Sequence, residues 1–286
     1  MTGSSLAGTG SLLRLAWRRD RVVIPVSVGV LVLFAVGSAQ ATLALYPSTA
    51  SLGPAIEQIF ASPSAVALYG PISDPTSPDA LAVVKTTMMG AVMLAILGYA
   101  LVRRHTRTEE EEGRFELVAG GVIGRRAPLT AAVTIATATV LLTCALTGLG
   151  YAAIGMNPAG SLAAAAGWAA TGLSFVGVAA IAAQLASTTR GAAGITMGVL
   201  GVAFLLRALA DSRSSWPEWV GWLSPVGWTT KASAFGADRA WVVLLGVALL
   251  AVCLLGAVAL LEHRDLGAGL LPDRRALTDQ LIIPAM

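Results

Sequence analysis

Six long runs of apolar residues constrain the fold of this chain more than any other feature. A helix needs about 20 mostly apolar residues to cross roughly 30 Å of hydrocarbon, and six runs reach that length. They cover residues 22–45, 80–102, 127–151, 161–186, 191–210 and 240–261. Backbone groups in lipid must hydrogen-bond within their own segment, so each run is predicted to be a helix. Only 12% of the residues are charged, against about 25% in soluble domains. The sequence therefore predicts an all-α membrane protein with six transmembrane helices.

The arginine and lysine residues indicate how the spans are oriented. Basic residues occur before the first span, in 103–126, in 187–190 and after the last span, whereas 47–79 and 156–160 contain none. Because cytoplasmic loops are enriched in basic residues, we expect both termini in the cytoplasm and the chain in the inner membrane of a bacterial cell. The connection from Arg207 to Arg239 departs from this rule, since it is expected outside but is basic.

The chain is thus expected to have three parts. They are a cytoplasmic N-terminus (1–21), a six-span domain (22–262) with a cytoplasmic loop at 103–126, and a cytoplasmic tail (263–286). Within the first part, the Gly/Ser/Thr-rich segment 1–11 is expected to be mobile. The amphipathic segment 12–21 is interpreted either as an anchor flanking the first span or as a helix lying flat on the membrane. Ala39-Gln40-Ala41 resembles a signal-peptide cleavage site, but the apolar run is too long for one and cleavage is not expected.

The loop 103–126 combines a run of charges with an apolar patch. As a helix it places Arg107 beside Glu111 and Glu110 beside Arg114, at the four-residue spacing of favourable ion pairs. The helix of the second span is expected to continue into this loop and to end at 120–121. Such a surface is typical of a docking site for another protein, although a solvated run of charges would show the same charge pattern.

The sequence lacks the residues that several kinds of chemistry require. No G-x-x-x-x-G-K-[ST] phosphate loop is present, so the chain is not expected to be an enzyme that hydrolyses ATP. His105 and Glu109 have no evident third ligand, so neither a metal site nor a directly bound cofactor is expected. No predicted span interior contains His, Asp or Glu, which argues against a proton-coupled carrier. Lys85 and Arg207 lie near predicted outer ends, where they can snorkel to water. No nucleic-acid signature is present.

Mildly polar residues inside the spans are candidates for a substrate pathway. Most such residues bond to a neighbouring helix or to a carbonyl of their own helix, and a pathway role is the alternative. A largely apolar interior favours a hydrophobic or amphipathic cargo over an ion. The candidates are Gln40, Thr86, Thr87, Thr134, Thr137, Ser174 and Gln184.

Short segments of the loop resemble those of a known class of transporters. They are Arg107-Thr108-Glu109-Glu110-Glu111, Gly113-Arg114-Phe115-Glu116-Leu117 and Gly124-Arg125. Supporting segments are 67–71, 223–228 and 264–270. Together they resemble the permeases of the ABC-2 class, and more closely the actinobacterial multidrug and polyether-antibiotic exporter permeases of the tetronasin-resistance type.

The resemblance implies a type V exporter-like bundle that exports drugs or antibiotics. It implies that the quoted loop residues, together with Glu112, form a coupling element that rests on a separate ATPase subunit. ATP and Mg²⁺ would then be bound by that partner. The amphipathic segment 12–21 would match the interfacial helix of these permeases, and membrane lipid would surround the bundle.

Permeases of this type often have two six-span halves, and the chain resembles the first of them. A second half is therefore expected as a partner, from another copy or from a paralogue. Two other interpretations remain: a lipid exporter on the same scaffold, and a membrane anchor or sensor whose loop recruits a cytoplasmic regulator.

Overall fold

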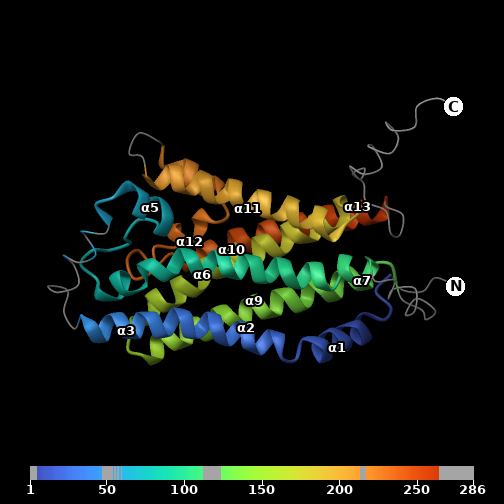
Figure 1. The fold of residues 1–286 in the computed structure, drawn as a ribbon, viewed down its shortest axis with the longest axis horizontal. Helices are drawn as coiled ribbons and strands as arrows, with labels where there is room; N and C mark the ends of the chain where they lie inside the picture. The colour runs from blue at the N-terminus through green and yellow to red at the C-terminus, as the bar shows by residue number, and fades with distance from the viewer. Residues whose placement is uncertain are drawn as a thin grey trace, which may run out of the picture.

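The computed structural model describes residues 5–46, 54, 56, 58, 60–111, 124–212 and 217–263, and these residues form helices and connecting turns without a strand. The helices make one elongated bundle (Figure 1). Six helical segments are long and apolar enough to cross a membrane, which confirms the predicted fold class. They are α2–η1–α3 (Val23–Val32, Leu33–Gly37 and Ser38–Leu45), α6 (Pro78–Arg104), α9 (Ala127–Ala153), α10 (Pro158–Leu185), α11 (Thr189–Ser212) and η3–α13 (Ala240–Val242 and Val243–Glu262).

The shorter helices lie at the two ends of the bundle. One end holds α1 (Thr9–Asp20) and α7 (Arg107–Glu111), and we name it the α1 end. The other holds α5 (Pro63–Tyr69), η2 (Glu218–Leu223) and α12 (Gly227–Lys231), and we name it the α5 end. The helix α5 falls within the outer connection 47–79 of the sequence prediction.

Local sequence explains where the spans begin. Pro78 and Pro158 occupy the first turns of α6 and α10, where a missing backbone N–H is not needed. The residues just before them cap the helices. Ser77 Oγ accepts from the N–H of Ala80 at 3.3 Å, and Asn157 Oδ1 accepts from two N–H groups of α10.

Helix α10 is the central element. In its most apolar stretch of 18 residues, 83% of the residues are buried inside the protein. The helix packs against α6, α9, α11 and α13. Glycines allow these helices to approach closely. A Cβ atom added at Gly246 of α13 would lie 2.5 Å from the Cα of Ala170, and one at Gly90 of α6 would lie 1.9 Å from the indole of Trp168. The core therefore depends on small residues on the neighbours of α10.

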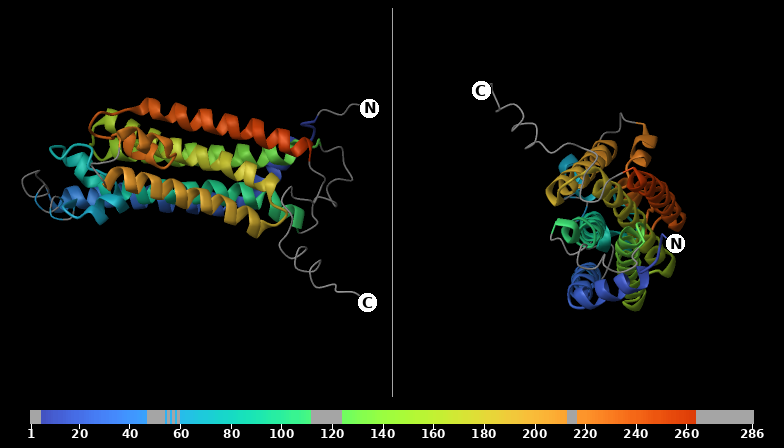
Figure 2. Two further views of the ribbon diagram at one scale, coloured as in Figure 1. Left: turned by 90° about the horizontal axis from the view of Figure 1, so that it is seen from above. Right: turned by 90° about the vertical axis from the view of Figure 1, so that its right-hand side faces the viewer.

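The amphipathic segment before the first span is helical and belongs to α1. A turn separates α1 from α2, and the end-on view shows α1 lying across the end of the bundle (Figure 2). It packs on α9, and its Ala16 is buried, whereas Trp17 is 55% exposed.

Candidate functional site

The loop residues predicted to couple the permease to an ATPase begin where α6 gives way to α7. Two residues, His105 and Thr106, separate the helices, and the Thr106 hydroxyl donates to the Val102 carbonyl at 2.7 Å. The predicted continuation of the second span into the loop is confirmed as far as Glu111, with this short break. The predicted helix end at 120–121 lies outside the described residues.

A buried carboxylate joins α1 to the end of α6. Asp20 is the last residue of α1, and none of its surface is exposed. Its Oδ2 accepts from Nε2 of His105 at 2.6 Å, and its Oδ1 lies 2.9 Å from Nε of Arg104. A buried charge is stable only with such partners. Beside it, Arg19 of α1 forms an ion pair with Glu109 of α7. Charges therefore hold α1, α6 and α7 together.

Arg107 points into the protein. Its side chain is 1% exposed, and its Nε donates to the carbonyl of Ala183 near the end of α10. The last carbonyls of a helix have no partner within that helix. Arg107 satisfies one of them and so anchors α7 on α10.

The other predicted coupling residues are described only in part. Thr108 and Glu109 are half-buried on α7, Gly124 is half-buried and Arg125 is exposed. The docking role of this loop stays a prediction. Outside the description are the side chains of Glu110 and Glu111 and the whole of Glu112, Gly113, Arg114, Phe115, Glu116 and Leu117.

The chain near its N-terminus pairs with the return of this loop. The N–H of Gly124 donates to the Ala7 carbonyl at 2.9 Å, and the N–H of Arg126 donates to the Ser5 carbonyl at 3.0 Å. Arg126 also forms an ion pair with Glu262 at the end of α13. Within the segment 1–11, which was expected to be mobile, the carbonyls of residues 5–7 thus accept hydrogen bonds and residues 9–11 belong to α1.

Sequence reasoning missed Asp20 and His105 as residues of this site. A signal for Asp20 was present: it is an acidic residue within an otherwise basic segment directly before a span. A carboxylate at that point needs cationic partners when the helix packs on the bundle. For His105 the sequence offered no comparable signal, since its partner comes from another helix.

The predicted pathway residues lie on four spans. Gln40 is exposed on α3, Thr86 and Thr87 are on α6, Thr134 and Thr137 are on α9, and Ser174 and Gln184 are buried or nearly so on α10. Several bond back to their own helix, as the first of the two interpretations expects. Thr86 and Thr87 both donate to the Val83 carbonyl, Thr134 donates to that of Thr130, and Ser174 donates to that of Ala170. A pathway role for these residues stays a prediction.

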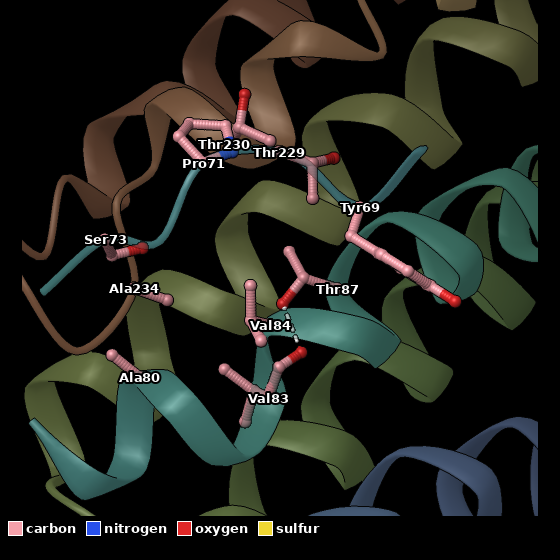
Figure 3. Close-up of a pocket in the computed structure, with 10 residues that line it drawn as sticks. All are labelled: Tyr69, Pro71, Ser73, Ala80, Val83, Val84, Thr87, Thr229, Thr230 and Ala234. Atoms are coloured by element: carbon pink, nitrogen blue, oxygen red, sulfur yellow. Dashed lines mark hydrogen bonds between the residues drawn. The ribbon is translucent and has the colours of Figure 1, made fainter. Parts of the chain in front are cut away.

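A small cavity lies at the α5 end, and Thr87 is one of its lining residues (Figure 3). Its free space of about 20 Å³ has room for one water molecule. The lining comes from Tyr69 at the end of α5 and the chain after it, from the first turns of α6, and from α12 and the residues after it.

Arg207 of α11 is fully buried at the same end, and its Nη1 would lie 3.6 Å from a Cβ atom added at Gly70. The expectation that it would snorkel to water is wrong, because Asp211 of the same helix and the carbonyls of α5 are its partners. Lys85, in contrast, is exposed on α6.

Six apolar spans and a helical bundle define a multi-pass membrane protein. Residues 10–264 match the family described as "Multidrug efflux system permease Rv1217c, C-terminal domain", and the chain belongs to that family. It is 39% identical over 276 residues to the "Multidrug efflux system permease protein Rv1217c" of Mycobacterium tuberculosis (strain ATCC 25618 / H37Rv). That alignment covers 95% of this chain and 49% of the relative, so the chain spans about half the relative's length. The family describes a C-terminal domain, which differs from the first-half assignment made on the sequence resemblance.

Proposed function

We propose that this chain is the permease part of an ATP-binding cassette exporter of the ABC-2, type V-like class. It carries hydrophobic small molecules such as drugs out of the cell, and a separate ATPase subunit binds ATP and Mg²⁺. The relative's name supports both multidrug efflux and a permease role. The loop segments that resemble tetronasin-resistance permeases support the ABC-2 class. The distribution of basic residues supports a cytoplasmic α1 end.

The observation that carries this proposal is the charged connection among α1, α6 and α7. Helix α6 has 27 residues, about 40 Å at the usual rise of 1.5 Å per residue. Its first turns line the cavity at the α5 end, and its last residue, Arg104, forms an ion pair with Asp20. A displacement of α7 by an ATPase, passed to α6 across the break at His105 and Thr106, would therefore reach the opposite end of the bundle along the single helix α6.

Exchange of the charges of Arg19 and Glu109 tests this coupling. Either Arg19→Glu or Glu109→Arg places like charges together, so we expect drug resistance of cells expressing the complete transporter to fall several-fold. The double exchange restores an ion pair and should restore resistance. Co-purification of the ATPase separates lost coupling from lost assembly.

The matched control is the exposed pair of Arg126 and Glu262, which does not involve α7. Reversal of Glu262 alone should leave resistance within the experimental error of the parent. Single reversals at Arg19 and Glu109 that leave resistance unchanged, in cells whose resistance depends on the transporter, would contradict the proposed lever.

We also propose that a second six-helix permease half, from another copy or a paralogue, completes the transporter. Two facts support this: the chain spans about half of its relative, and α11 presents small residues to open space. Nothing lies within 4 Å of a Cβ atom added at Gly194, Gly198 or Gly201. Such faces allow close helix packing in membranes.

Mass measurement of the detergent-solubilised active complex tests this assembly. We expect two permease halves for each pair of ATPase subunits. Gly198→Leu should leave the chain folded but reduce the fraction of paired halves, because the added side chain stands on the packing face. An active complex with one permease half would contradict the proposal.

A further inference from the structure

The Arg207 side chain holds the end of helix α5. Its Nη2 donates to the carbonyls of Ala67 at 2.8 Å and Leu68 at 3.3 Å, and its Nη1 donates to that of Val66 at 3.4 Å. The carbonyls of Ala67 and Leu68 are among the last of this seven-residue helix and have no N–H partner further along it, whereas that of Val66 also accepts from the N–H of Gly70 at 2.8 Å. A cation at a helix C-terminus is also favoured by the helix dipole. The guanidinium therefore caps α5 from a different segment of the chain.

Two further contacts fix the position of the guanidinium. Nη1 lies 3.4 Å from Oδ2 of Asp211, and the charged group stands 4.7 Å from the centroid of the Phe204 ring. Arg207 is five residues before the end of α11, roughly 7–8 Å along the helix. An arginine buried there is costly unless it is paired and hydrogen-bonded. Detachment of α5 would remove most of these partners, so the attached state is strongly favoured.

The chain that leaves α5 covers the cavity. Gly70 has a φ of +90° and turns the chain, and a Cβ atom at this position would lie 2.6 Å from Cγ2 of Thr230 on α12. Pro71, which lies next to Thr230, and Ser73 follow and line the cavity, which Ala80 at the start of α6 also lines (Figure 3). The bound α5 thus places residues 70–73 over the first turns of α6 and beside α12.

We propose that residues 63–73 form a lid over this cavity, and that Arg207 is the positioning residue that latches the lid to α11. Release of the α5 carbonyls from Arg207 opens the cavity between α6 and α12 at the α5 end. The purpose of the lid rests on the proposed export function, in which cargo leaves at this end. The latch itself is a property of the folded chain and is tested without transport.

Thiol labelling of the cavity wall measures the opening. Ala80, which is 2% exposed, is replaced by cysteine, and the purified full-length protein reacts with a water-soluble maleimide. Arg207→Met removes the donors, and we expect the labelling rate at residue 80 to rise at least about tenfold, because bonds to a charged group are strong and labelling follows the open population. The native Cys144 and Cys253, both buried, report general loosening and should keep their rates.

Two variants complete the design. Gly70→Ala leaves every charge in place but disfavours the turn, and it should also accelerate labelling at residue 80. Arg239→Met removes an exposed arginine at the same end and should not. If the Arg207→Met protein fails to accumulate, Gly70→Ala decides. Unchanged labelling at residue 80, or an equal increase at Cys144, would overturn the lid. If the labelling rates at residue 80 behave as expected but the unsubstituted protein does not export drugs, the lid stands and the proposed export function is contradicted.

Discussion

Buried charged side chains fasten both ends of the bundle. Asp20 at the α1 end and Arg207 at the α5 end are each fully buried, and each connects a short helix to a span. Removal of one member of such a cluster leaves the others buried without a partner, which costs more than the cluster contributes in stability. Removal of one member of an exposed ion pair costs little, because water solvates the remaining charge. The two kinds of pair should therefore respond differently to the same kind of substitution.

Asp20→Asn tests this difference. The amide removes the negative charge that buried His105 and partly exposed Arg104 face, so we expect the free energy of unfolding to fall by about 1–3 kcal/mol, the usual cost of impaired buried hydrogen bonds. Thermal unfolding in detergent is the measurement. Glu262→Gln, which removes one member of an exposed pair, should change stability by less than about 1 kcal/mol. Equal stability of the two variants would show that the buried cluster contributes no more to stability than an exposed ion pair.

At the scale of the helices, glycine determines how closely α6 approaches α10. Gly90 leaves room for the indole of Trp168, whose Nε1 donates to the Thr87 carbonyl at 2.9 Å. A methyl group at Gly90 cannot fit beside this ring. Gly194 of α11 differs from Gly90, because no atom of the protein would contact a methyl group added there.

Gly90→Ala should therefore lower the free energy of unfolding by about 1–3 kcal/mol, the usual cost of an overfilled core. The intrinsic fluorescence of Trp168 should change too, because the indole must move. Gly194→Ala is the control, and it should be neutral or slightly stabilising in the isolated chain, because alanine favours a helix. A stable Gly90→Ala protein with an unchanged spectrum would indicate that α6 and α10 tolerate a wider separation.

At the scale of the whole molecule, the two ends of the bundle are expected on opposite sides of the membrane. Exposed basic residues mark both ends: Arg125 near the α1 end and Arg239 near the α5 end. If the α1 end is cytoplasmic, as the basic residues indicate, Arg239→Cys should react with an impermeant thiol reagent in whole cells. Arg125→Cys should react only after permeabilisation. The reverse pattern would invert the orientation and place the lid in the cytoplasm.

The sequence by itself determined the six spans and their limits to within a few residues. It also predicted that the helix of the second span continues into the start of the following loop, whereas for the segment before the first span it left a flanking anchor and a flat helix as alternatives. These features follow from local properties: hydropathy over about 20 residues and the four-residue spacing of opposite charges in the loop. Family membership likewise agrees with the multidrug-permease resemblance read from the loop.

Only the tertiary structure decided what the charged residues do. The sequence predicted a docking surface that included Arg107 and an Arg207 that reached water, whereas both side chains are buried. Their partners come from distant segments: 85 residues separate Asp20 from His105, 76 separate Arg107 from Ala183, and 140 separate Arg207 from Ala67. Hydropathy averages the polarity of the residues in one segment, so it contains no information about which helices pack against each other. A buried charge, in contrast, is stable only where folding places its partner, so its role depends on the packing of the helices.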